Sequence, residues 1–580
     1  MTVTDVEVAV DATGLLLAFN EAGLLEISDV HVADRICALG KEDDERVALA
    51  VALLVRALRG GSVCVDLSTM EEAIGVDDVP WPEPVEWQAT LRASVLLRQP
   101  VLHLYDDRLL YLDRYWREEK QVCDDLLALL ASRLTPKMPA FERLFPEGYE
   151  EQREAAEVAL CQATTVLTGG PGTGKTTTVA RLLALIAEQA ELSGLPRPRI
   201  ALVAPTGKAA ARLQEAVAHE VAKLEAADRV RLGELEAMTL HRLLGRRPDT
   251  STRFRHDRGN RLPHDVIVVD ETSMVSLTLM ARLLEAVRRD ARLILVGDAD
   301  QLASVEAGAV LADLVDGLSA RPDVRVAALR TSHRFGESIG ALAEAIRIGD
   351  ADRVLALLRS GDEHIEFLEF GEGDDPSRRL HSILVPHALR LRQAAALGAV
   401  DVALSALDEH RLLCAHRRGP FGVAHWNAQV QKWIAEETGQ PAWSEWYAGR
   451  PLLVTANDYG LRVYNGDTGV TVAGPDGLRA VIAGATGPLD FAISRLGDIE
   501  TMHAMTIHKS QGSQAEEVTV LMPPQDSRLL TRELFYTAVT RAKRKVRVVG
   551  SDVSVRAAIG RRAVRASGLR LRLQAGHGRR

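Results

Sequence analysis

Residues 164–176 read TTVLTGGPGTGKT, and this stretch decides the fold. Its first half is β-branched and apolar, which predicts a buried strand, and apolar residues from Val179 to Ile186 recur at the spacing of an amphipathic helix. A glycine-rich turn between a strand and a helix, closed by Lys175 and Thr176, is the pattern of a phosphate-binding loop. The sequence therefore predicts an α/β domain that binds a nucleoside triphosphate.

Each residue type in this loop has a chemical reason to be there. Glycines adopt backbone angles closed to other residues, so amide groups can turn inward around an oxyanion. Lys175 supplies a positive charge for the β- and γ-phosphates, and the Thr176 hydroxyl can ligate Mg²⁺. The residues expected to contact the nucleotide through the loop are Gly169, Gly170, Pro171, Gly172, Thr173, Gly174, Lys175, Thr176 and Thr177.

Length and composition bound the class of protein. With 580 residues the chain is too long for one core, so several domains are expected. No apolar run reaches the roughly 18–20 residues that span a bilayer, so no membrane association is expected. The five cysteines are scattered without a C-x-x-C pair, which disfavours a disulfide scaffold or a zinc site. With an acidic N-terminus unlike a signal peptide, these features predict a cytoplasmic protein.

Charge is distributed unevenly along the chain. Residues 1–150 contain 28 acidic and 14 basic side chains, so the net charge of −10 leaves +4 for the remainder. From Arg541 onward there are 13 Lys and Arg and one acid, Asp552. Basic segments favour a polyanionic partner, and the acidic first third is therefore expected to have a different role.

The pattern from 150 to 335 alternates strands and helices, as in a parallel α/β sheet. Residues 200–204, 266–269 and 293–296 are short apolar runs suited to strands buried on both faces. Polar residues follow each run, and ligand sites in such sheets lie at the carboxyl ends of strands. The polar and basic segment 246–265 is expected to be a surface hairpin or loop.

The rest of the chain is less regular. The first third mixes helical patterns with strand-like pieces at 62–67 and 101–112, and residues 450–500 are β-rich with glycine turns. The predicted division is an N-terminal domain over 1–135, a first α/β domain over 136–335, a second over 336–560 with a small β-barrel inserted around 450–500, and a basic tail over 561–580.

Two carboxylates follow the predicted strand VIVV. Asp270 can hold the Mg²⁺ carried by the nucleotide, and Glu271 can polarise the attacking water as a general base. The next strand leads into LVGDADQ, where Gln301 is expected near the γ-phosphate. Arg334 and Arg541 are candidates for stabilising charge on the transferring phosphoryl group, since a guanidinium can grip two phosphate oxygens.

Three segments, APTGKAAARL, TLHRLLG and TIHKSQG, place hydroxyl and basic groups just after an apolar stretch. Such groups can bind a phosphate backbone without reading bases. Taken one at a time, polar loops with no ligand stay the alternative interpretation.

The order of these motifs is that of a known group. GGPGTGKT, APTGKAAA, VVDETS, VGDADQ, SHRF, TIHKSQG and YTAVTRAK resemble the superfamily 1 DNA helicases. LHLYDDRLLYLDRYWREE, RRGPFGVAHWN and VYNGDTGV look like the RecD subunits of bacterial RecBCD (exonuclease V) complexes. The resemblance covers nearly the whole chain and is strongest from 150 to 545.

The resemblance implies a specific architecture and activity. It implies two RecA-like motor domains with ATP and Mg²⁺ in the cleft between them, an SH3-like insertion and a mixed, mostly helical N-terminal domain. It implies 5′ to 3′ unwinding of DNA ends beside RecB-like and RecC-like subunits, with any nuclease in a partner. Gln152 matches the adenine-contacting glutamine, and 246–265 the strand-separating pin. The implied DNA contacts are Pro205, Thr206, Lys208, His241, Thr506, His508, Lys509 and Gly512.

Other functions are compatible with the same residues. A stand-alone RecD-like helicase would work without partners, but those proteins are expected to carry a longer N-terminal extension than this chain has. A mainly structural subunit with a vestigial ATPase is a second alternative, and a P-loop NTPase acting on RNA or protein is a third.

Overall fold

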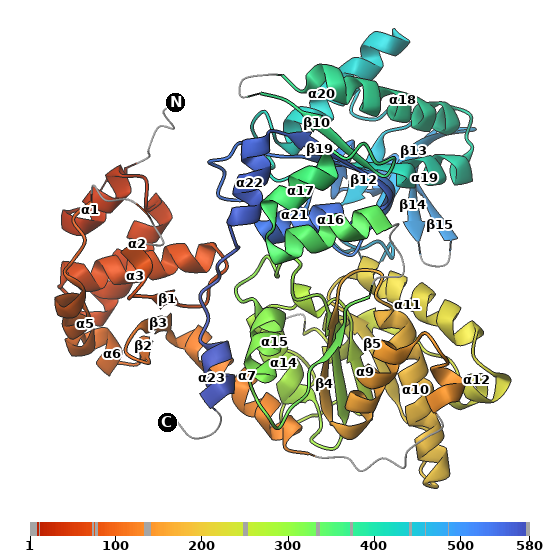
Figure 1. Ribbon diagram of the computed structural model, residues 1–580. Coiled ribbons are helices and arrows are strands. Elements are labelled where there is room, and N and C mark those ends of the chain that lie inside the picture. Colours follow the sequence, from red (N-terminus) through yellow and green to blue (C-terminus); the bar gives the residue numbers. More distant parts are fainter. Residues whose placement is uncertain are drawn as a thin grey trace.

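The computed structural model describes residues 8–10, 12–71, 75, 79–132, 141–247, 253–331, 337–371, 375–439, 444–458, 460–484 and 487–575. The chain forms two parallel sheets with flanking helices, an antiparallel sheet and a small three-stranded sheet, which confirms the predicted α/β class. Figure 1 shows the first helices beside the two larger bodies, and the C-terminal helix returning towards them.

The first parallel sheet has the strand order β6-β5-β7-β8-β4-β9. Its strands are β4 (Thr164–Gly169), β5 (Ile200–Ala204), β6 (Ala237–Thr239), β7 (Val266–Val269), β8 (Arg292–Gly297) and β9 (Ala327–Leu329). Its helices are α8 (Phe141–Leu144), α9 (Glu150–Cys161), α10 (Lys175–Leu192), α11 (Gly207–Ala222), α12 (Ala226–Leu232), α13 (Leu240–Leu244), α14 (Leu277–Ala286) and α15 (Val310–Ser319).

Both faces of this sheet are buried, as the apolar runs predict. In β7, Val266 and Val268 face one core with α8 to α12, whereas Ile267 and Val269 face the other. The second core also receives α14, α15 and a helix of the N-terminal region, α7 (Asp113–Leu130). The first third of the chain therefore shares a core with the first parallel sheet.

The second parallel sheet has the order β10-β19-β18-β11-β17. Its strands are β10 (Ile365–Glu369), β11 (His410–Cys414), β17 (Ala504–Thr506), β18 (Ala515–Leu521) and β19 (Ala542–Gly550). Its helices are α16 (Glu337–Ile348), α17 (Ala351–Leu358), α18 (Ser377–Ala396), α19 (Val400–Glu409), α20 (Val423–Thr438), the 3-10 turn η3 (His508–Ser510), α21 (Arg532–Val539) and α22 (Asp552–Gly560).

An antiparallel sheet interrupts the second parallel sheet in sequence, between α20 and β17. Its order is β15-β14-β13-β12-β16, with β15 and β16 at the two edges. The elements are β12 (Pro451–Val454), β13 (Thr468–Gly474), β14 (Gly477–Gly484), β15 (Gly487–Ala492), the 3-10 turn η2 (Ile493–Arg495) and β16 (Ile499–Thr501).

The N-terminal region is mostly helical. Its elements are α1 (Gly14–Glu21), α2 (Ile27–Gly40), α3 (Glu45–Arg59), α5 (Pro84–Ala93), α6 (Val95–Arg98), α7, β1 (Val65–Asp66), β2 (Leu102–Tyr105) and β3 (Leu109–Leu112). The strand-like piece expected at 101–112 is a hairpin, since Asp106 and Asp107 both have positive φ, 53° and 54°, at a tight turn.

The segment 246–265 is a loop in its described part. Arg246 and Phe254 form an isolated antiparallel bridge, and residues 248–252 lie outside the described residues. The loop is fixed at its base, because Phe254 and Leu262 are buried and Arg258 pairs with Asp125 of α7 at 2.6 Å.

In its described part, residues 561–575, the basic segment expected as a tail folds back on the molecule. Helix α23 (Leu569–Ala575) buries Leu569 and Leu573 against α7 and α15. Its Arg572 donates to the fully buried Glu119 of α7 at 2.8 Å and lies over the rings of Tyr105 and Trp116.

We expect Arg572→Met to lower the free energy of unfolding by about 3–5 kcal/mol, because it leaves the buried Glu119 carboxylate without its cation. Arg570→Met on the same helix is the control. Arg570 is exposed and 4.0 Å from Asp316, so its loss should cost under about 0.5 kcal/mol. Urea titration followed by tryptophan fluorescence measures both, and equal midpoints would contradict the assignment.

Candidate nucleotide and nucleic-acid site

Three neighbouring strands of the first sheet end side by side. Strands β7, β8 and β4 are adjacent and parallel, so their carboxyl ends meet at one edge. The glycine-rich loop follows β4, Asp270 and Glu271 follow β7, and Asp298 follows β8. Segments separated by about 130 residues of sequence are thereby brought to one place.

The glycine-rich loop has the geometry of an anion cradle. Gly172 and Gly174 have φ of 83° and 86°, which other residues adopt only with strain. The Lys175 ammonium donates to the carbonyls of Gly169 and Gly170 at 2.6 and 2.9 Å, so the loop folds over the side chain. Helix α10 starts at Lys175 and aims its first amides at the same space.

A cavity of about 610 Å³ lies between this edge and the second sheet. The sequence-predicted residues that line it are Gln152, Pro171, Gly172, Gly174, Lys175, Thr176, Thr177, Asp270, Glu271, Gln301 and Arg541. Gly169, Gly170 and Thr173 line a larger neighbouring cavity instead.

Gln152 holds the loop from behind. Its side-chain amide donates to the Thr173 carbonyl at 3.2 Å. A Cβ atom at Gly174 would lie 3.2 Å from that same amide nitrogen, so the close approach depends on glycine. Gln152 is therefore packed against the loop as well as facing the cavity.

The two carboxylates after β7 are each held in an unusual way, Asp270 by its electrostatic surroundings and Glu271 by its backbone conformation. Burial and the neighbouring Glu271 raise the pKa of Asp270, and Lys175 partly opposes the shift. Glu271 has φ of 50° and ψ of 41°, the left-handed region that a residue with a Cβ atom adopts at a cost of about 1–2 kcal/mol. Such strain is typical of residues held in place for a function.

Asp298 connects the two parallel sheets. It is buried and accepts from Gln301 Nε2 at 2.9 Å and from the hydroxyl of Tyr536, on α21 of the second sheet, at 3.1 Å. The backbone N–H of Leu302 donates to Thr537 Oγ1 at 2.9 Å, and Gln511 Nε2 donates to the Leu302 carbonyl at 2.7 Å. Residues beside the cavity in one sheet thus contact the other sheet directly.

Of the two arginines predicted for the site, one lies at the cavity and the other is outside the described residues. Arg541 is buried, lines the cavity, and donates to the carbonyls of Thr537 at 3.1 Å and Ser513 at 3.4 Å. Arg334 lies outside the described residues.

Asp298, from the motif LVGDADQ, also lines the cavity, together with four residues that the sequence did not single out: Gly148, Tyr149, Arg212 and Gln514. Tyr149 stacks under the Arg181 guanidinium at 4.0 Å, three residues before Gln152. Arg212 is in the APTGKAAARL segment, for which the sequence predicts DNA contacts only. It lies in the second turn of the amphipathic helix α11, and that periodicity is the signal that places it beside the cavity.

Two predicted DNA-contact segments meet across the two sheets. Thr206 caps α11 by accepting from Ala209 N at 3.2 Å, and Thr506 caps η3 by accepting from Lys509 N at 3.2 Å. Arg212 of α11 donates to the Gly512 carbonyl at 2.6 Å. The hydroxyls that could bind phosphate therefore also cap their own backbone.

The basic side chains of these segments are held differently. Burial, then Arg411 and Arg212, lowers the pKa of Lys208 to about 7, and a nearby anion would favour its charged form. Lys509 already pairs with Glu500 at 2.7 Å. Burial and the nearby Arg565 and Arg417 lower the pKa of His508. His241, which follows β6, packs its ring on Phe254, and Pro205 follows β5 beside it.

Within the described residues no helix is both long and apolar enough to cross a bilayer. The same part of the chain contains no group of three or more His, Cys, Asp or Glu side chains arranged to hold a metal ion.

Family models match three parts of the chain. The RecBCD enzyme subunit RecD N-terminal domain matches residues 21–109, an AAA domain matches 152–307, and a UvrD-like helicase C-terminal domain matches 501–549. The two parallel sheets, the cavity between them and these family matches together define a P-loop protein with two motor domains, of the helicase class.

Close relatives narrow the class. The chain is 75% identical over 575 residues to the RecBCD enzyme subunit RecD of Mycobacterium tuberculosis, covering 99% of each. It is 68% identical over 561 residues to that of Mycolicibacterium smegmatis, covering 97% of this chain and 99% of the relative. It is 31% identical over 449 residues to the ATP-dependent RecD2 DNA helicase of Deinococcus radiodurans, covering 76% and 55%. The chain belongs to the RecD family.

The left-handed backbone of Glu271 generates a stability prediction. Glu271→Gly and Glu271→Gln both remove the carboxylate, but only glycine tolerates φ of 50° without steric cost. We expect the glycine variant to be more stable than the glutamine variant by about 1 kcal/mol, measured from urea unfolding midpoints. Equal stability would show that the backbone there is unstrained.

Proposed function

We propose that the chain is an ATP-dependent DNA helicase subunit that moves 5′ to 3′ on one strand of a DNA end, within a RecBCD-type heterotrimer. The observation that carries the proposal is the 610 Å³ cavity, to which the first sheet contributes the phosphate loop and acids and the second contributes Arg541. A hydrolytic site lined from both sheets can convert hydrolysis into relative movement of the two.

The donor set of the cavity fits a nucleotide with its cation. Among the described residues, the Thr176 hydroxyl and the Glu271 carboxylate make no hydrogen bond, so both can serve a ligand. Lys175 would grip the β- and γ-phosphates, Gln152 the adenine, and Thr176 and Asp270 would hold Mg²⁺. When bound, Mg²⁺ neutralises part of the negative charge on the phosphate oxygens.

The remaining residues act on the reacting centre. Glu271 would accept a proton from the attacking water, and Gln301 would sense the γ-phosphate. Arg541, with Arg334, would stabilise charge on the transferring phosphoryl group. Because Asp298 binds both Gln301 and Tyr536, a change at the γ-phosphate can reach the second sheet through one carboxylate.

The proposed DNA track crosses both motors at α11 and η3. The meeting of these elements at Arg212 and Gly512 supports it, as does the lowered pKa of Lys208. The residues proposed to contact single-stranded DNA are Pro205, Thr206, Lys208, His241, Thr506, His508, Lys509 and Gly512. Contacts of this kind go to phosphate and sugar, so binding should be independent of base sequence.

The same proposal gives a function to the N-terminal region, to the segment 246–265 and to the antiparallel sheet. The N-terminal region over 1–135 would dock RecB-like and RecC-like partners, 246–265 would separate strands, and the antiparallel sheet around 450–500 would be the SH3-like insertion. In this proposal the first motor domain spans residues 136–335 and the second spans residues 336–560. We place nuclease activity in a partner subunit and the complex in the cytoplasm, with the DNA it processes.

We expect Lys175→Ala to lower ATP hydrolysis stimulated by single-stranded DNA by about 10²–10³-fold, because it removes the cation from the phosphates. Its fold should be intact by circular dichroism. Lys223→Ala, an exposed lysine paired with Glu220 in the same domain, is the control and should hydrolyse ATP within about twofold of the parent. Retained DNA-stimulated hydrolysis in Lys175→Ala would overturn the site, and stronger stimulation by RNA would overturn the substrate.

A further inference from the structure

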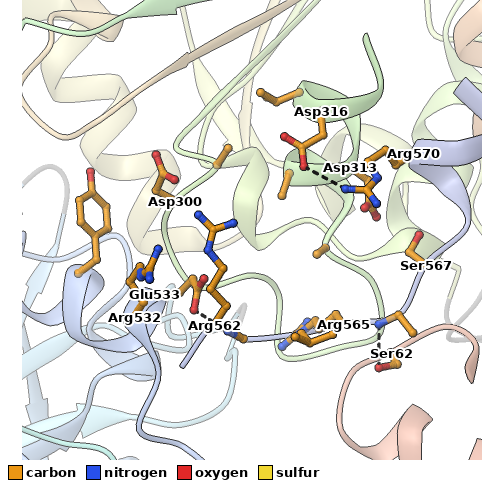
Figure 2. A pocket seen from close by; sticks show the side chains of 18 of the residues that line it. Ser62, Asp300, Asp313, Asp316, Arg532, Glu533, Arg562, Arg565, Ser567 and Arg570 are labelled. Atoms are coloured by element: carbon orange, nitrogen blue, oxygen red, sulfur yellow. Dashed lines mark hydrogen bonds and ion pairs between the residues drawn. The ribbon is translucent and has the colours of Figure 1, made fainter. Parts of the chain in front are cut away.

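The chain crosses back between the motors after α22. Residues 561–568, the strap, run from the end of α22 on the second sheet to α23 against the first. The strap also pairs with the N-terminal region: Val63 N donates to the Ala566 carbonyl at 3.0 Å, and Ala566 N donates to Ser62 Oγ at 3.1 Å. Figure 2 shows Arg565 on the strap beside Ser62.

Arg565 points from the strap into a loop of the first motor. Its Nη1 donates to the Ser304 carbonyl, to the Glu306 carbonyl at 3.1 Å and to the Gly308 carbonyl at 3.3 Å. Burial lowers its pKa, and none of the described carboxylates forms an ion pair with it. A partly buried cation with no acid beside it loses some of its hydration, and its hydrogen bonds to the loop carbonyls compensate for that loss.

The loop that Arg565 holds starts directly after Gln301. Its first residue, Leu302, is bound by Thr537 and Gln511 of the second motor. Its last part is bound by the N-terminal region, since Gly308 N donates to the Gly61 carbonyl at 2.9 Å. Arg565 lies between these two attachments, and its guanidinium joins the carbonyls of residues 304, 306 and 308 within the loop.

The local packing is built around this guanidinium. A Cβ atom at Gly61, which has φ of 87°, would lie 2.8 Å from Arg565 Cζ. The N-terminal region, the first motor and the strap therefore converge on one side chain. An uncharged apolar side chain of similar size at position 565 would remove the donor that these three carbonyls share.

We propose that Arg565 is a positioning residue of the motor: it fixes loop 302–308, so that Gln301 keeps its place at the cavity while the second motor moves. This rests on the proposed function. Arginine suits the task because one planar guanidinium has five donors. The ammonium of lysine has three donors and can satisfy the same carbonyls in part.

The strap has anchors that do not involve Arg565. Leu569 and Leu573 are fully buried, and Glu119 binds Arg572, Ser567 Oγ and Gly568 N. A change at Arg565 is therefore expected to free the loop and leave the strap docked.

The test compares Arg565→Ala and Arg565→Lys with the parent full chain. Arg562→Ala, exposed three residues earlier on the same strap, is the matched control. We measure kcat and KM for ATP with single-stranded DNA, base pairs unwound per ATP, and the thermal midpoint. For Arg565→Ala we expect kcat and base pairs per ATP each to fall about five- to tenfold, with KM within about twofold. Arg565→Lys should recover at least half of the loss, and Arg562→Ala should match the parent.

Two results would overturn the proposal. One is an Arg565→Ala enzyme with parental kcat and base pairs per ATP. The other is a loss of activity that only follows a lowered thermal midpoint, with base pairs per ATP unchanged, which indicates a structural role. Failure of the proposed function looks different, because the parent chain itself would then lack hydrolysis that depends on Lys175 and DNA.

Discussion

The arrangement of the molecule depends on one constraint, the parallel pairing of β4, β7 and β8. Parallel strands of one sheet end at a shared edge, so whatever follows them in sequence is brought together in space. The glycine-rich loop, the acid pair at 270–271 and Asp298 meet for this reason alone. Strands buried on both faces fix the edge firmly, because a shift of register would move charged residues into a core on either side.

The second sheet is tied to that edge by few but well-buried contacts. Asp298 to Tyr536, Leu302 to Thr537 and Gln511 to Leu302 all join residues beside the cavity to the other sheet. These are hydrogen bonds across a cleft, which can be exchanged without disturbing either core. The strap differs, since its far end is locked by apolar burial and by Glu119. One connection between the motors is thus adjustable and another is permanent.

The sequence predicts features that are local. The strand, turn and helix around Lys175 and the apolar runs that became β5, β7 and β8 are visible in short windows, and shared strand ends then imply the rest of the site. Pairings over long separations are not visible in this way. Nothing near Arg572 indicates Glu119, and nothing near Arg565 indicates carbonyls some 260 residues earlier. The left-handed backbone of Glu271 is also hidden, because its residue type gives no sign of it.

The attachment of α23 to α7 has a consequence for how the protein is made. Glu119 and Arg572 are 453 residues apart. At a synthesis rate of roughly 5–20 residues per second, the acid is incorporated about 20–90 seconds before its cation. During that interval the first third of the chain and the first parallel sheet can assemble, but the Glu119 carboxylate has no cation beside it until α23 is made. Helix α23 therefore completes this core late in synthesis, and a chain released before α23 is made leaves Glu119 without Arg572.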